Sequence, residues 1–161
     1  MPSATLLAQS VLSGVFTGAL YGLLGLGLSL SWGLLRQINL AHFAFAFLAA
    51  YLCYQLSTMG WDPLATLVLV VPLFFALGAA LHAAMMRFQI TPFNSLLLTF
   101  GLTGIVEALI QSIWTADFRK LESHYGEHRW KVAGLYVPLP EVITLVFSAG
   151  LAFAVWAVLR Y

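Results

Sequence analysis

The chain opens with an apolar stretch that carries no formal charge. From Met1 to Leu35 there is no Lys, Arg, Asp, Glu or His. A helix over Leu6–Leu35 would be roughly 45 Å long, whereas the hydrocarbon core of a bilayer is about 30 Å thick. A soluble domain has no use for such a segment. The pattern therefore predicts a first membrane span whose excess length is taken up by tilt or a local break.

Four further apolar segments follow, each close to the roughly 20 residues that a spanning helix needs. They are Ile38–Leu56, Pro63–Met86, Ser95–Trp114 and Val137–Leu159. Helices are expected because an open sheet edge leaves backbone groups unsatisfied in lipid, and the strict alternation of a membrane barrel is absent. The sequence predicts an all-α, polytopic transmembrane helix bundle of about five spans, with residues 1–161 as a single transmembrane domain.

Residues 116–136 interrupt this apolar pattern. They gather more than half of the chain's charged residues and predict an extramembrane polar loop, with room for a short amphipathic helix on the surface. Tryptophans favour membrane interfaces, and Trp61 and Trp114 lie at predicted span ends. Arg36, Arg87 and Arg160 also end spans and fall on one side. The Lys/Arg count does not decide the orientation, although their positions favour the cytoplasm.

The composition supports a membrane protein. It is 61% hydrophobic and 8% charged with a mean hydropathy of +0.93, whereas soluble domains are about 25% charged. A net charge of +1 argues against nucleic acid as a partner. The single cysteine, Cys53, lies in an apolar run and is expected to pack as a small core residue. The N-terminus lacks a basic leader region, so the first span is expected to be retained.

Glycines recur along the first span at helical spacing. Gly14, Gly18 and Gly22 are four residues apart, and Gly25 follows three residues later. On a helix they lie along one stripe, where small residues let another helix approach closely. The stripe predicts a helix-packing face, and direct contact with a solute is the less favoured alternative.

Asn39 and His42 open the second span. Asn39 is expected to be the helix N-cap, with His42 one turn later on the same side. One interpretation is a capped helix with a hydrogen-bonded interfacial histidine, and the other is a re-entrant or gating element. No carboxylate or histidine lies at ligand spacing from them, so no metal site is expected. His82, in the third span, is expected to be a packing or snorkelling residue.

Glu107 is a carboxylate in the middle of the fourth span. Such a group costs about 2.5 kcal/mol or more on insertion scales and is tolerated when it faces protein or water. Thr103 and Gln111 lie one turn before and after it, which makes a polar stripe in an apolar helix. The stripe indicates either a helix–helix contact or the lining of a solute pathway.

The sequence contains no nucleotide-binding loop and no hydrolase or metalloprotease motif. No catalytic residues and no cofactors are therefore assigned, and the chain is not expected to be an enzyme. An intramembrane enzyme using His42, His82 and Glu107 is a minor alternative.

The stretch from Gly22 to His42, GLLGLGLSLSWGLLRQINLAH, resembles the start of a LivH-type inner-membrane permease. An alanine-rich helix closing Ala50-Tyr51 follows, and Leu98-Thr99-Phe100-Gly101-Leu102 resembles a later segment of that family. The resemblance runs along essentially the whole chain. By position it covers Gly33, Asn39, His42 and Gly101. One departure is Phe43, where family members usually carry glycine.

This resemblance implies the permease subunit of a bacterial ABC importer for branched-chain amino acids, urea or short amides. The implied partners are a second permease subunit, cytoplasmic ATPase subunits and a periplasmic solute-binding protein, and the implied location is the bacterial inner membrane. Family permeases are nearly twice as long, so the resemblance predicts the front half of a permease. A structural subunit that packs within a larger complex is the alternative. The expected pathway or gating residues are Asn39, His42, Thr103, Glu107 and Gln111.

Overall fold

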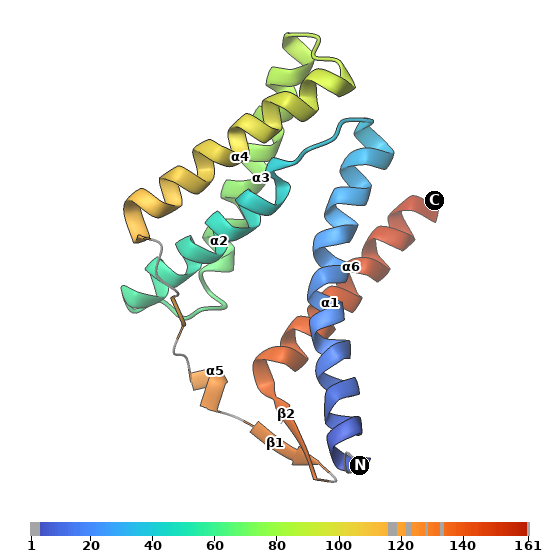
Figure 1. The fold of residues 1–161 in the computed structure, drawn as a ribbon, viewed down its shortest axis with the longest axis vertical. Helices are drawn as coiled ribbons and strands as arrows, with labels where there is room; N and C mark the ends of the chain where they lie inside the picture. The colour runs from blue at the N-terminus through green and yellow to red at the C-terminus, as the bar shows by residue number, and fades with distance from the viewer. Residues whose placement is uncertain (1–3, 116–118, 122–123, 128, 133, 161) are drawn as a thin grey trace. The chain divides into compact units, whose positions relative to one another are not determined.

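Five long helices make up most of the protein (Figure 1). The computed structural model describes residues 4–115, 119–121, 124–127, 129–132 and 134–160. The long helices are α1 (Ala4–Leu35), α2 (Ala41–Thr58), α3 (Leu67–Arg87), α4 (Pro92–Trp114) and α6 (Leu139–Arg160). The predicted all-α polytopic fold is confirmed. Backbone contacts divide the chain into unit 1, Met1–Gly27 with Glu122–Tyr161, and unit 2, Leu28–Leu121.

Within the described chain, four helices are long and apolar enough to cross a membrane, namely α1, α3, α4 and α6. The fifth, α2, has 18 residues, so it is roughly 27 Å long, and it includes His42 and Gln55. Most large apolar side chains on the spanning helices are exposed, including Val68 at 79% and Phe75 at 78%. Lipid or further helices must cover such surfaces, because a soluble monomer rarely exposes large apolar patches.

In unit 2, α2 packs against both α3 and α4 (Figure 1). The core joins Ala44 of α2 to Val106, Ile110 and Trp114 of α4. Small side chains on α2 allow the close approach, since Ala44 is only 3% exposed. At the far end of this contact the Trp114 indole Nε1 donates to Gln55 Oε1 at 3.0 Å. This bond gives the indole a partner inside the protein as well as its apolar contacts.

The ends of α1, α3 and α4 lie within one residue of the predicted ends, whereas all five helix starts differ from the predicted starts by two to four residues. α1 ends at Leu35, and Arg36 follows in the left-handed region at φ 50°. α2 begins at Ala41 rather than Ile38. α3 begins at Leu67 rather than Pro63, because Asp62 Oδ1 accepts from the backbone N–H groups of residues 64 and 65 and forms a turn.

Unit 1 contains an antiparallel hairpin of β1 (Arg129–Val132) and β2 (Leu135–Pro138). Gly134 takes φ +85° in its turn, a conformation that glycine adopts without strain. Gln9 of α1 binds β2 through both ends of its amide. Its Nε2 donates to Tyr136 O at 3.0 Å, and Tyr136 N donates to its Oε1 at 2.8 Å. One polar side chain of an apolar helix thus extends the hairpin's backbone pairing.

The predicted polar loop lies partly outside the described residues, at 116–118, 122–123, 128 and 133. Its described part holds the four-residue helix α5 (His124–Glu127) as well as β1 and the start of β2. The hairpin was not expected from the sequence.

Candidate functional site

The connection between α1 and α2, residues 36–40, is held against α4 by two hydroxyl side chains. Ser95 and Thr99 are both fully buried. The backbone N–H of Leu40 donates to Thr99 Oγ1 at 3.0 Å. Ile38 O lies 3.4 Å from Ser95 Oγ and 3.3 Å from Thr99 Oγ1. Each hydroxyl has one proton and a shorter contact within α4, from Ser95 Oγ to Pro92 O at 2.7 Å and from Thr99 Oγ1 to Ser95 O at 2.8 Å. The Leu40 N–H is therefore the backbone group of this irregular segment that α4 satisfies, as a membrane interior requires.

The expectation that Asn39 caps α2 is wrong. The N-cap position is Leu40, at φ −70° and ψ −24°, and no side chain of the segment caps the helix. The Leu40 N–H is satisfied by Thr99 of α4 instead. Because the neighbouring helix supplies this acceptor, the Asn39 side chain is left to point elsewhere.

Asn39 lies in the wall of a small cavity in unit 2. The cavity has a volume of about 40 Å³. It is formed by the end of α1, the α1–α2 connection and the C-terminal part of α3, and its lining residues are Ser31, Leu35, Gln37, Asn39, Gly78, Leu81, His82 and Met85. Among the lining residues, Asn39 and His82 each have one buried atom, Oδ1 and Nδ1, that has no hydrogen-bond partner within the described chain.

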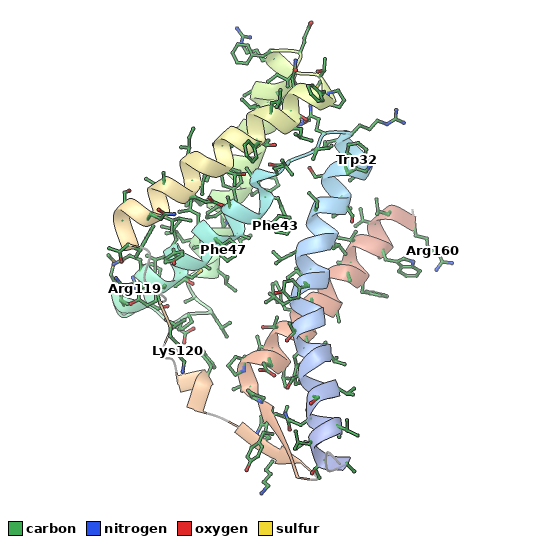
Figure 2. All side chains as sticks on the ribbon, in the orientation of Figure 1. Trp32, Phe43, Phe47, Arg119, Lys120 and Arg160 are labelled. Atoms are coloured by element: carbon green, nitrogen blue, oxygen red, sulfur yellow. The ribbon has the colours of Figure 1, made fainter. Side chains whose placement is uncertain are left out.

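His42 lies one turn further on and is not part of this cavity wall. Its ring is half-buried and meets the edge of Phe43, with the ring centroids 5.5 Å apart. Phe43 and Phe47 project from the same helix (Figure 2) and are 41% and 66% exposed. The close approach of α2 to its neighbours is made by Ala41 and Ala44, so the bulky Phe43 does not enter that contact.

Polar residues recur every four positions along α4, at Ser95, Thr99, Thr103, Glu107 and Gln111. Each step of four residues turns about 40° beyond a full helical turn. The stripe therefore winds around the helix and leaves the face that packs on α2. Ser95 and Thr99 are buried, Thr103 is half-buried, and Glu107 and Gln111 are exposed. Residues on the packed face, Val106 and Ile110, are 5% and 7% exposed.

The five predicted pathway residues therefore do not form one cluster. Thr103 Oγ1 donates to the backbone O of Thr99 in its own helix at 2.9 Å. Glu107 stands two turns beyond Thr99, roughly 12 Å along the axis, and shares its exposed face with Gln111. Asn39 and His42 lie at the other end of the α2–α4 contact. The structure thus defines a buried docking point at one end of α4 and an uncovered polar face at the other.

The predicted packing stripe of α1 makes no close contact in the described chain. A Cβ placed on Gly14, Gly18, Gly22 or Gly25 would have no neighbour within 4 Å. Phe16 is the one residue of α1 that is buried. A packing role for this stripe remains a prediction, and it requires a helix that the described contacts do not include.

Sequence reasoning missed the residues that hold unit 2 together. Ser95 and Thr99 had a signal, because they extend the four-residue spacing of the polar stripe toward the start of α4. Gln55 had none, because its partner, Trp114, lies on another helix, 59 positions away in the sequence. Trp114 was expected at the membrane interface, and the structure buries it to 7% exposure against Tyr51, with ring centroids 5.4 Å apart.

Four helices long and apolar enough to cross a membrane, within the described residues, define a multi-pass membrane protein. One of them, α4, carries the buried hydroxyls of Ser95 and Thr99 and, in mid-helix, the carboxylate of Glu107. A family model described as "Branched-chain amino acid transport system / permease component" matches residues 10–161. The chain belongs to this family of membrane transport permeases, which is not a class of enzymes. No curated protein and no solved structure matches the chain.

Proposed function

We propose that this chain lines part of the solute route of a LivH-type ABC importer in the bacterial inner membrane. The single observation that carries the proposal is the match of residues 10–161 to the permease family. The solute we assign is a branched-chain or other hydrophobic amino acid, or a small amide such as urea. We expect the chain itself to carry out no covalent chemistry. It contributes part of a passage whose shape changes during transport.

The exposed face of α4 supports a role in this passage. Glu107 and Gln111 are polar groups on a spanning helix, at a position that α2 leaves uncovered. A carboxylate facing hydrocarbon is costly, so water or another protein helix must face it. We infer that Thr103, Glu107 and Gln111 line the route, and that Asn39 and His42 belong to a gate at the start of α2.

We infer that other subunits supply the energy for transport, since members of an ABC importer share the work and residues 1–161 contain no phosphate-binding loop. We propose cytoplasmic ATPase subunits, a second permease subunit and a periplasmic solute-binding protein as partners. The ends of α1 and α3 contribute to one cavity, so Arg36 and Arg87 lie at the same end of unit 2. We assign this end to the cytoplasm, where short loops carry an excess of Lys and Arg.

Uptake by whole cells tests the proposal directly. Deleting the chain from its host should lower uptake of radiolabelled leucine or of radiolabelled urea at least tenfold, and a plasmid copy should restore it. Purification from detergent-solubilised membranes should recover a nucleotide-binding subunit whose ATP hydrolysis is stimulated by the same solute. Unchanged uptake of both solutes, with a stable complex that lacks any nucleotide-binding chain, would indicate a structural subunit and contradict the proposal.

A further inference from the structure

The β1–β2 hairpin of unit 1 is attached to two membrane-spanning helices at once. β2 ends at Pro138 and α6 begins at Leu139, so no linker separates the strand from the span (Figure 1). In addition, both amide atoms of the Gln9 side chain on α1 bind the backbone of Tyr136. Since α1 and α6 are each long and apolar enough to cross a membrane, the hairpin lies beside the first turns of two spans.

The part of α1 that the hairpin follows is apolar. Leu6 and Leu7 lie within one turn of Gln9, and both side chains are exposed. A Cβ placed on Gly134, in the turn of the hairpin, would lie 4.0 Å from Thr5 Cγ2 of the same helix. The hairpin therefore lies at a level where leucine side chains are uncovered, and lipid covers such groups more favourably than water does.

The hairpin itself carries the residue types that favour the boundary between hydrocarbon and headgroups. Trp130 and Tyr136 are 50% and 54% exposed, and both residue types are enriched at membrane interfaces. Lys131 is also exposed, and its Nζ lies 5.6 Å from the centroid of the Tyr136 ring. The face of an aromatic ring attracts a cation at this distance, so the ring helps to position the ammonium group on the surface of the hairpin.

The charge of the hairpin favours an anionic neighbour. Residues 129–138 include two basic residues and no Asp or Glu. An ammonium group forms strong, short hydrogen bonds with phosphate oxygens, and anionic lipids attract Lys and Arg near a membrane surface. A phospholipid headgroup supplies a phosphate at the depth that Trp and Tyr prefer.

The opposite end of α6 carries a similar pair. Arg160 Cζ lies 5.0 Å from the centroid of the Trp156 ring, and the Trp156 side chain is exposed. α6 has 22 residues, so it is roughly 33 Å long, close to the hydrocarbon thickness of about 30 Å. One cation–aromatic pair precedes this helix and another ends it, which is the spacing expected for the two surfaces of one bilayer.

We propose that the hairpin binds the headgroup of an anionic phospholipid, with Lys131 paired to the phosphate and with Trp130 and Tyr136 at headgroup depth. The bound lipid fixes the start of α6 at the membrane surface and, through Gln9, the start of α1 beside it. The site belongs to unit 1 and does not depend on the proposed transport function.

Direct contact is measurable because the chain has two lysines, Lys120 and Lys131. The full chain, labelled with ¹⁵Nζ-lysine, is placed in bilayers of phosphatidylethanolamine and phosphatidylglycerol, and solid-state NMR measures how lipid ³¹P dephases each lysine nitrogen. The signal that Lys131→Gln removes is that of Lys131, and we expect lipid to dephase it strongly. No dephasing would show that the hairpin meets water or a protein partner, and equal dephasing by inorganic phosphate in a phosphorus-free detergent would show an unspecific anion contact. Either result would overturn the proposal.

A matched pair of substitutions tests whether the contact stabilises the protein. We expect the Tm of the wild-type chain to be higher in nanodiscs that contain phosphatidylglycerol than in nanodiscs of phosphatidylcholine. Lys131→Gln should remove at least half of this difference, because it deletes the charge that faces the headgroup. Lys120→Gln removes an exposed lysine outside the hairpin and should leave the difference unchanged. No difference in the wild type, or equal losses from both variants, would overturn the proposal.

Discussion

The two ends of α4 carry the same kind of residue at the same spacing and have opposite surroundings. At the N-terminal end, Ser95 and Thr99 are completely buried, and Thr99 Oγ1 accepts from the Leu40 N–H. At the C-terminal end, Glu107 and Gln111 are exposed. Because an α-helix has 3.6 residues per turn, residues spaced four apart move gradually around it. The same spacing therefore places its first residues on the buried face of α4 and its last residues on the exposed face.

The two ends of α4 thus differ in what their polar groups can do. Those at the start are hydrogen-bonded inside unit 2, and those at the end can still contact a solute. A hydroxyl whose hydrogen bonds are complete inside the protein fixes a segment in place and has little left for a solute. A carboxylate on an uncovered face must find its partner outside unit 2. We therefore expect substitutions near the start of α4 to change stability, and substitutions near its end to change transport.

Replacing Glu107 should have the largest effect. Glu107→Leu should lower solute uptake at least tenfold while leaving membrane insertion and Tm nearly unchanged, because no described contact of unit 2 depends on the carboxylate. Uptake in cells, normalised to the amount of protein in the membrane, measures this. Ile105→Ala, on an exposed apolar position of the same helix, is the control and should transport normally. Normal uptake by Glu107→Leu would remove this residue from the route.

The glycine stripe of α1 is the next test, because it is also an exposed face without a partner in the described chain. Gly18→Leu should prevent assembly with the second permease subunit, since the new side chain would separate two closely packed helices. The readout is the size of the complex in detergent by gel filtration with light scattering. Leu20→Ala is the control, because residue 20 lies on the opposite side of α1. If Gly18→Leu leaves the size and stability of the complex unchanged, the glycine stripe faces lipid and not a partner helix.

At the buried end of α4, Thr99→Val should destabilise the protein by about 1–2 kcal/mol, because the Leu40 N–H loses its acceptor. Thr103→Val is the matched control, since the Thr103 hydroxyl bonds only within its own helix, and it should cost less than about 0.5 kcal/mol. Thermal unfolding in detergent compares the two. Equal losses would mean that Thr99 does not anchor the α1–α2 connection.

The smallest expected effect is at Gln111. Gln111→Leu should lower uptake roughly two- to fivefold, because it removes a neutral polar group one turn beyond the carboxylate, and Tm should stay within about 1 °C. For Gln55→Leu we expect the opposite result, a change in stability without a change in transport. It should lower Tm by leaving the Trp114 N–H unpaired, with uptake per folded protein unchanged. If Gln111→Leu lowers Tm and spares uptake, the division between the two ends of α4 fails.

The sequence predicts the helices well because lipid imposes their length and composition. The predicted spans end at Leu35, Met86 and Trp114, and the helices end at Leu35, Arg87 and Trp114. The predicted start of α2, Ile38, is wrong because the true start depends on Thr99, a residue 59 positions away in sequence from Leu40. A hydrogen bond of this kind has no local signature in the sequence.

The hairpin shows a signal that was present and overlooked. Trp130 and Val132 alternate with polar neighbours, Leu135 and Val137 follow, and Gly134 lies in the two-residue turn between the strands. Alternating apolar residues around a two-residue turn with glycine are typical of a hairpin. The high charge of residues 116–136 suggested a loop instead, because composition averages over a pattern that is only ten residues long.

A solute route along the end of α4 is tested most directly by the reactivity of a cysteine at position 107. The reagent is a hydrophilic, charged methanethiosulfonate, and the background is Cys53→Ser. Ile105→Cys, 67% exposed at the wild-type position and facing another side of α4, is the reference. We expect Glu107→Cys to react at least tenfold faster than Ile105→Cys, and we expect transported solute to slow its reaction. Equal rates at the two positions, with no protection by leucine or urea, would contradict a solute route along the end of α4.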